Sequence, residues 1–275
     1  LEQTKLTLVT MTMQDHATLK EIKDLAKNIT LQYGTPDLCI EAMRKKNLKT
    51  MIFISQLKAK TNFQVVGLTM KCYSPLCKNA SRMDQNLRTP VPMTWAFMMR
   101  EAGFPAVRSI YELPLSDDVL DEVREEMRSL GSYIALNLDG SSQERTFSLS
   151  IAENLIAKIQ SETDIPIVIV YGPKGEDKAR ALVDCYNNVY RLSLSPSIKR
   201  SAAIIKDAYI AITPDTSILY MASAYNTPVV AIYADYKTRW PAMADVSESV
   251  VVGQKIDNIS LDEFAKALKS VLARI

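Results

Sequence analysis

A turn that carries one acid and three hydroxyl groups separates a predicted strand from a predicted helix. Tyr209-Ile-Ala-Ile212 is a buried-strand pattern, and Thr213-Pro-Asp-Thr-Ser217 follows it directly. The helix that comes next would start with unpartnered backbone N–H groups and the positive end of its dipole. Together with the hydroxyls of Thr216 and Ser217, these groups suit a phosphate. An alternative stays open, because Asp215 or Thr216 can serve only to cap the helix.

Two further turns with polar residues follow predicted strands. Asp139-Gly-Ser-Ser142 comes after one strand, with Arg145 three residues later. Gly172-Pro173 comes after the other, and Glu176 begins the next predicted helix. Since ligands of parallel α/β sheets bind beyond the carboxyl ends of the strands, these turns are candidates for one binding site. The alternative is that the serines are ordinary turn residues and Glu176 a first-turn helix carboxylate.

Strands and helices that would position these turns alternate through the second half of the chain. Runs of β-branched residues predict strands, and apolar residues at helical spacing predict helices. The predicted strands are 133–138, 165–170, 189–192, 209–212 and 228–233, and the predicted helices are 148–161, 176–185, 197–207, one that ends near 225, and 261–275. This alternation predicts an α/β fold with a doubly wound parallel sheet.

The first half repeats this pattern less clearly. Residues 6–10 and 50–54 have strand-like patterns, with 65–66 in a third strand, and helices are expected near 18–28 and 93–102. The charged segment 115–130 is either the last helix of a first domain or a linker. We therefore expect an N-terminal domain of residues 1–130 and a C-terminal domain of residues 131–275, both Rossmann-like.

Charge is divided unevenly between the two parts. Residues 1–110 contain 16 Lys and Arg against 8 Asp and Glu, whereas residues 111–275 contain 17 against 23. A basic first part favours a polyanionic partner on that side. No apolar run is long enough to span a membrane, and the first residues lack a signal-peptide pattern. We expect a cytoplasmic protein.

The cysteines do not predict a metal site. Only Cys72 and Cys77 of the four are close in sequence, and the single histidine, His16, cannot complete a usual zinc set with them. We expect reduced thiols and no bound metal.

Three blocks of the second half resemble glycosyltransferase family 9, the ADP-heptose:lipopolysaccharide heptosyltransferases. These blocks are Leu136–Ser142 with Arg145, Ile167–Pro173 with Glu176, and Ile212–Ile232, and their order and spacing match over about residues 132–275. The resemblance implies a GT-B fold, in which two Rossmann-like domains face each other across a cleft, with the nucleotide sugar bound by the C-terminal domain.

The resemblance also implies a set of donor-binding residues. Gly140, Ser141 and Ser142 match the loop that faces the diphosphate and sugar, and Arg145 matches a basic residue that neutralises phosphate. The segment near adenine and ribose is matched by Gly172, Pro173 and Glu176, and the sugar–phosphate end by Asp215, Thr216, Ser217 and Tyr220. Many family members have histidine where this chain has Tyr220, and tyrosine can donate a hydrogen bond but cannot be a cation.

The catalytic base implied by the resemblance is an aspartate after the first N-terminal strand. It would deprotonate the acceptor hydroxyl for direct displacement with inversion. Asp15 follows the predicted strand 6–10 and is one candidate, although it can also be only a helix N-cap. The other interpretation is that the family's first strand and loop precede Leu1, since the part before Tyr133 is short for this family.

These inferences predict an inverting transferase that moves a heptose from ADP-heptose to the core of lipopolysaccharide or lipooligosaccharide. ADP-sugar would be a substrate, with no cofactor and no metal, and Arg145 and the helix after Asp215 would replace a metal ion electrostatically. The acceptor would be an anionic glycolipid at the inner face of the cytoplasmic membrane, and no nucleic-acid partner is expected. The alternatives are a relative that uses another donor, such as a UDP-hexosamine, and a non-catalytic nucleotide- or glycan-binding module.

Overall fold

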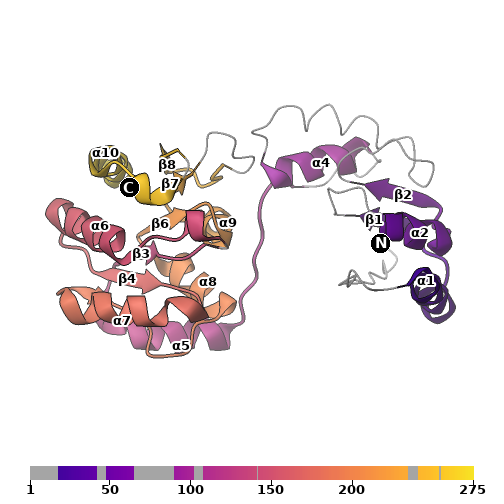
Figure 1. The fold of residues 1–275 in the computed structure, drawn as a ribbon, viewed down its shortest axis with the longest axis horizontal. Coiled ribbons are helices and arrows are strands. Elements are labelled where there is room, and N and C mark those ends of the chain that lie inside the picture. The colour runs from indigo at the N-terminus through magenta and orange to yellow at the C-terminus, as the bar shows by residue number, and fades with distance from the viewer. Residues whose placement is uncertain are drawn as a thin grey trace. The chain divides into compact units, whose positions relative to one another are not determined.

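The computed structural model describes residues 18–41, 48–64, 90–101, 108–140, 142–234, 241–253 and 255–275. The chain divides into two compact units (Figure 1). Unit 1 consists of residues 1–86 and 94–107, and unit 2 of residues 87–93 and 108–275. The expected domain boundary at residues 130 and 131 therefore falls inside unit 2.

Unit 1 contains a short parallel β–α–β arrangement. Strands β1 (Leu38–Glu41) and β2 (Thr61–Gln64) pair in parallel, and α2 (Leu48–Leu57) lies between them in sequence. Helix α1 (Leu19–Tyr33) packs against α2 and begins with a capping box. Helix α4 (Val91–Glu101) is divided between the two units: its residues up to 93 belong to unit 2 and those from 94 onward to unit 1. Both helices expected in this half, near 18–28 and 93–102, are confirmed.

The strand predicted at residues 50–54 is wrong, because these residues lie inside α2. A short apolar run fits a buried strand and a buried helix equally well by periodicity. The helix extends the run on both sides and buries Phe53, Ile54 and Leu57. The predicted strands at 6–10 and 65–66 lie outside the described residues.

Unit 2 is built on one parallel sheet, as predicted. Its described strands pair in the order β5-β4-β3-β6-β7-β8. They are β3 (Ile134–Asn137), β4 (Ile167–Val170), β5 (Val189–Tyr190), β6 (Ile210–Pro214), β7 (Val229–Tyr233) and β8 (Ser247–Val251). The first five confirm the predicted strands. Strand β8 was not predicted, since Ser247-Glu-Ser249 gives this edge strand a polar start.

Helices cover both faces of this sheet (Figure 1). They are α5 (Asp117–Met127), α6 (Leu149–Glu162), α7 (Glu176–Cys185), α8 (Ile198–Asp207), α9 (Ser217–Tyr225) and α10 (Leu261–Leu272). Four 3-10 turns are also described: η2 (Arg128–Leu130), η3 (Gln143–Arg145), η4 (Pro173–Gly175) and η5 (Ile256–Asn258). Apolar side chains of α6, α7 and α10 form the core on one face, and those of α5, α8 and α9 form the core on the other. The doubly wound sheet is thereby confirmed.

Helix α5 is the charged segment that the sequence left as a domain helix or a linker. Its apolar residues Leu120, Val123 and Met127 are buried in the core that α8 and α9 share. Two ion pairs tie it to α8 as well, Glu122 with Arg200 at 2.8 Å and Arg124 with Asp207 at 2.6 Å. Burial of three such side chains contributes far more than partly exposed ion pairs, which are worth about 0–1 kcal/mol each. Packing therefore assigns α5 to unit 2.

Within the described residues, no helix combines the length and apolar character needed to cross a bilayer.

Candidate functional site

The topological switch point of the sheet lies between β3 and β6. These strands are hydrogen-bonded neighbours, but the helix after β3, α6, covers one face and the helix after β6, α9, covers the other. The two chain segments diverge beyond the carboxyl ends of the strands, which is where open α/β sheets bind ligands. The turns at Asp139–Arg145 and at Asp215–Thr216 both begin there.

A buried amide holds the two strand ends together. Asn137, the last residue of β3, is only 2% exposed, and its Nδ2 donates to Thr213 Oγ1 and Thr216 Oγ1 at 3.1 Å each. The hydroxyl oxygen of Thr216 in turn accepts the Ile218 N–H and caps α9. Because a buried polar group without a partner costs several kcal/mol, this network favours one alignment of β3, β6 and the start of α9.

Arg145, Asp215 and Tyr220 form a charged cluster at the start of α9. Nη1 of Arg145 donates to the backbone oxygen of Asp215 at 3.2 Å and lies 3.5 Å from its carboxylate. The Tyr220 hydroxyl donates to the other carboxylate oxygen of Asp215 at 3.3 Å. The ring of Tyr220 lies 5.4 Å from that of Tyr111. The chain thus brings together an arginine from the loop after β3 and an aspartate from the turn after β6.

Burial and charge act in opposite directions on the ionisation of this cluster. Burial raises the pKa of Asp215 above its usual value, although the Arg145 charge and the Tyr220 hydrogen bond partly oppose this shift. Burial, followed by the charge of Asp215, raises the pKa of Tyr220. Tyr220 therefore stays a neutral hydrogen-bond donor, and Arg145 is the cation of this cluster.

The loop after β3 is tightly folded. The Gly140 N–H donates to Thr146 Oγ1, and the Thr146 hydroxyl donates to the backbone oxygen of Ser142. A Cβ atom on Gly140 would lie 2.5 Å from the backbone oxygen of Arg145, so a larger residue does not fit there. This close approach directs Arg145 back across the loop toward Asp215.

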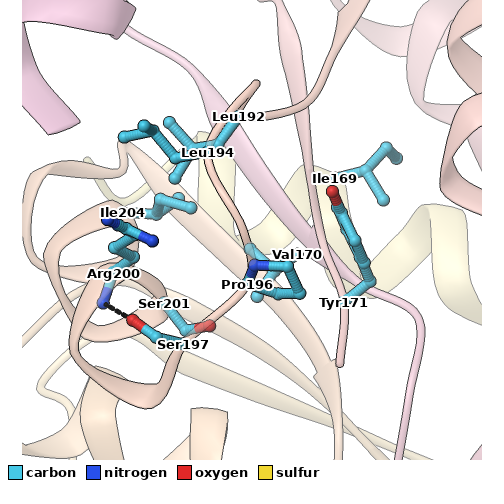
Figure 2. Close-up of a pocket in the computed structure, with 10 residues that line it drawn as sticks. All are labelled: Ile169, Val170, Tyr171, Leu192, Leu194, Pro196, Ser197, Arg200, Ser201 and Ile204. Atoms are coloured by element: carbon cyan, nitrogen blue, oxygen red, sulfur yellow. Dashed lines mark hydrogen bonds between the residues drawn. The ribbon is translucent and has the colours of Figure 1, made fainter. Parts of the chain in front are cut away.

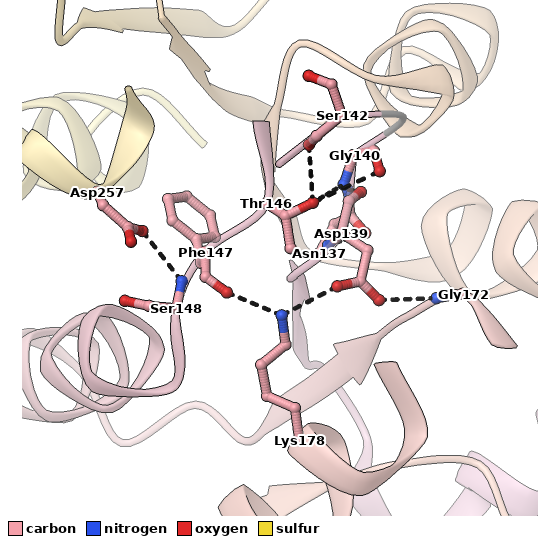
Figure 3. Close-up of polar contacts among 10 residues, drawn as sticks. All are labelled: Asn137, Asp139, Gly140, Ser142, Thr146, Phe147, Ser148, Gly172, Lys178 and Asp257. Carbon is pink, nitrogen blue, oxygen red and sulfur yellow. Dashed lines mark hydrogen bonds and ion pairs between the residues drawn. The ribbon is translucent and has the colours of Figure 1, made fainter. Parts of the chain in front are cut away.

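The loop after β4 runs beside the loop after β3 (Figure 3). The Gly172 N–H donates to the carboxylate of Asp139 at 3.1 Å. Pro173 begins the short turn η4, and Glu176 begins α7, where it pairs with Arg180 at 3.3 Å. Glu176 is thus a half-exposed first-turn carboxylate beside the loop.

A small, largely apolar pocket lies next to this loop, beyond the carboxyl ends of β4 and β5 (Figure 2). Its wall includes Tyr171 from the end of β4, Leu192 and Leu194 from the segment after β5, and Pro196 before α8. The Tyr171 hydroxyl accepts a hydrogen bond from Arg191 at 3.0 Å. The pocket combines an aromatic ring with aliphatic side chains, and its free interior holds about one water molecule, so it offers an apolar wall and not a ring-sized cavity.

The structure brings most of the predicted donor-binding residues to one edge of the sheet. Asp15 and Ser141 lie outside the described residues. Asp139 and Thr213 lie in the candidate turns selected from the sequence but were given no role there, and Asn137 and Lys178 were not selected. A polar residue at the end of an otherwise apolar strand was a usable signal for Asn137 and Thr213. No group of three or more His, Cys, Asp or Glu that could hold a metal occurs in the described parts of the chain.

The model of Glycosyltransferase family 9 (heptosyltransferase) matches residues 93–265. The chain belongs to this family. YeeL of Escherichia coli (strain K12) is 92% identical over 159 residues, which are 58% of this chain and 68% of that protein.

Solved structures agree with the family assignment at the level of fold. The ADP-heptose lps heptosyltransferase II of E. coli superposes with a TM-score of 0.67 at 12% identity, over 93% of this chain and 82% of that one. The E. coli heptosyltransferase WaaC with ADP-2-deoxy-2-fluoro heptose superposes with a TM-score of 0.61 at 14% identity, over 93% of this chain and 76% of that one. The predicted α/β fold of the GT-B class is confirmed.

Proposed function

We propose that this family 9 chain is an inverting heptosyltransferase that takes heptose from ADP-heptose and adds it to the core of lipopolysaccharide or lipooligosaccharide. The single observation that carries the proposal is the meeting of Arg145, Asp215 and the capped start of α9 at the switch point. At the start of α9, a cation, a carboxylate and the positive end of the helix dipole lie together.

The charges of the cluster suit the diphosphate of a nucleotide sugar. Arg145 Nη1 and the start of α9 attract the phosphate oxygens, and charge that develops on the leaving diphosphate would be stabilised by the same groups. Asp215 and the Tyr220 hydroxyl offer an acceptor and a donor to sugar hydroxyls. In this proposal ADP-heptose is a substrate, and neither a cofactor nor a metal takes part.

The nucleoside would lie against the loop after β4. Glu176 is half-exposed beside this loop and can accept hydrogen bonds from ribose hydroxyls. The base would lie against the apolar side chains at Tyr171 and Leu192. Heptosyltransferase II, by its name, uses ADP-heptose, and the proposal extends that donor to this chain.

Chemistry at the acceptor requires a general base, which we assign to Asp15. It would take the proton from the acceptor hydroxyl while that oxygen attacks the anomeric carbon and ADP leaves, so that the configuration inverts. The acceptor would be an anionic glycolipid at the inner face of the cytoplasmic membrane, met by the basic first part of the chain.

The test measures both steps with purified protein. Isothermal titration with ADP, ADP-heptose and UDP gives the donor preference. Release of ADP and extension of a heptose-deficient core acceptor give turnover, with and without EDTA. We expect ADP-heptose to bind more tightly than UDP, and turnover that EDTA does not change.

Each other outcome selects a different function. Tighter binding of UDP would reject the ADP assignment and favour a relative that uses a UDP-hexosamine. Binding of ADP-heptose without turnover on several matched acceptors would favour a nucleotide-binding module. Asp15→Asn should lower turnover by about 100-fold or more with donor affinity unchanged. Unchanged turnover would remove Asp15 as the base.

A further inference from the structure

The carboxylate of Asp139 joins the loop after β3 to the loop after β4 (Figure 3). One oxygen accepts the Gly172 N–H at 3.1 Å, and the other accepts Lys178 Nζ at 3.0 Å. The side chains of Asp139 and Lys178 are only 20% and 17% exposed. This ion pair therefore contacts little water, and screening weakens it less than a surface pair.

Lys178 ties together the start and the end of the loop after β3. Besides its bond to Asp139, its Nζ donates to the backbone oxygen of Phe147 at 2.8 Å. Phe147 follows the loop directly, and its N–H donates to the backbone oxygen of Leu138. Lys178 itself belongs to α7, the helix that the loop after β4 introduces. One ammonium group therefore links three segments of the chain.

The carboxylate has almost no freedom to move toward η4. A Cβ atom placed on Gly175 would lie 2.0 Å from Asp139 Oδ2, so the carboxylate packs directly on the glycine backbone. The Gly172 N–H holds the same oxygen from the other end of this short turn. The position of the loop after β4 is thus fixed relative to Asp139.

We propose that Asp139 and Lys178 form a positioning pair that holds the two donor-binding loops at one spacing. The inference rests on the proposed function, in which the loop after β3 contacts the diphosphate and the loop after β4 contacts the nucleoside. The pair lets the two loops bind both ends of one nucleotide at once, because neither loop must be ordered after the first contact forms.

The first experiment needs no ligand. Hydrogen exchange of backbone amides is followed by mass spectrometry in the wild-type chain, Asp139→Asn and Lys178→Ala. Both variants should exchange about tenfold faster in peptides covering residues 139–147 and residues 171–178, since the loops open more often without the pair. Asp184→Asn on the exposed side of α7 is the matched control and should leave both peptides unchanged.

The second experiment separates positioning from direct contact. Asp139→Asn should weaken ADP binding by about tenfold or more, whereas adenosine and pyrophosphate, each of which contacts one loop, should change by less than about twofold. Lys178→Arg should keep most of the ADP affinity that Lys178→Ala loses, because its guanidinium can still reach both the Asp139 carboxylate and the Phe147 backbone oxygen.

Three results would overturn the inference or part of its basis. If the exchange rate of one of the two loops is the same in both variants as in the wild-type chain, the positioning pair is rejected. A loss of pyrophosphate affinity as large as the loss for ADP would also reject it, and would indicate that the pair acts directly on phosphate. If the wild-type chain binds no nucleotide, the proposed function is wrong, while the exchange experiment still decides whether the pair couples the loops.

Discussion

Arg145→Ala tests the assignment of the diphosphate site. In the free protein, Arg145 Nη1 lies 3.2 Å from the backbone oxygen of Asp215 and 3.5 Å from its carboxylate, with the arginine side chain 40% exposed. The Asp215 side chain is only 10% exposed, so the loss of its cationic partner should destabilise the fold to some extent. Urea unfolding of the variant therefore accompanies the binding measurement, and affinity is compared at a temperature at which both proteins are folded.

The expected defect follows from the bond that Arg145 would make to the nucleotide. A hydrogen bond between two charged groups contributes about 1.5–3 kcal/mol, which corresponds to a roughly 10- to 150-fold weaker affinity for ADP. Isothermal titration at one fixed ionic strength measures it, because salt changes the strength of such contacts. Arg128→Ala removes an exposed arginine from η2 and is the matched control, with affinity expected to stay within about twofold.

A second variant distinguishes two ways in which Arg145 could act. If Arg145 only neutralises Asp215, then Asp215→Asn makes Arg145 dispensable, and Arg145→Ala has no further effect in that background. If Arg145 binds phosphate, the loss of about tenfold or more persists in the Asp215→Asn background. An unchanged ADP affinity in a folded Arg145→Ala single variant would refute the assignment altogether.

Three further predictions concern the ionisation, packing and boundaries of unit 2. Burial raises the pKa of Asp215 in the folded protein above its usual 3.8. The stability of the wild-type chain relative to Asp215→Asn should therefore be greatest below pH 3.8 and should fall as the pH rises through the folded-state pKa. Urea unfolding of both proteins from about pH 4 to 7 measures this difference in stability, and a difference that rises with pH would contradict the prediction. Gly175→Ala should cost about 1–3 kcal/mol because its Cβ would meet a carboxylate, whereas Gly172→Ala, with open space at its Cβ, should leave the melting temperature nearly unchanged; equal melting temperatures would contradict this. A fragment of residues 108–275 should unfold cooperatively. A fragment of residues 131–275 lacks α5 and with it about 5–8 kcal/mol of stabilisation from apolar burial, so its circular dichroism spectrum should be that of a largely unfolded chain. Equal stability of the two fragments would return the domain boundary to residue 130.

The second half of the chain could be predicted closely because local and long-range signals agree there. Apolar runs such as Ile167–Val170 are bounded by turn residues and alternate with helices of clear periodicity. Parallel strands joined by helices allow few topologies, so the order of strands and helices along the chain is nearly enough to predict a doubly wound parallel sheet. Strand β8 was missed because only the end of Ser247–Val251 is apolar.

The first half could be predicted less well for a physical reason. The apolar run at residues 50–54 is too short for its period to distinguish a helix from a strand, and only its continuation to Leu57 decides for the helix. Helix α5 has a similar ambiguity, since its single apolar face fits a core on either side. The packing partners on α8, about 80 residues later in the chain, decide its place.

The charged residues of the candidate site divide into those with a local signal and those without one. Asp215 and Thr216 could be selected because a strand ends and a helix begins at that turn. Asp139 and Lys178 are 39 residues apart, and nothing near either residue indicates that they meet. Their contact depends on the register of β3 with β4, which brings the two strand ends level.

Charge balance at the switch point explains why the two roles of Arg145 must be separated. The raised pKa of Tyr220 keeps this residue neutral, so it adds no charge to the cluster. The Arg145 cation and the Asp215 carboxylate therefore nearly cancel in the free protein. A bound diphosphate adds negative charge, and only Arg145 and the start of α9 can offset it within this cluster. A residue that compensates Asp215 in the free state would thus compensate the diphosphate in the bound state, which is why the Asp215→Asn background separates its two roles.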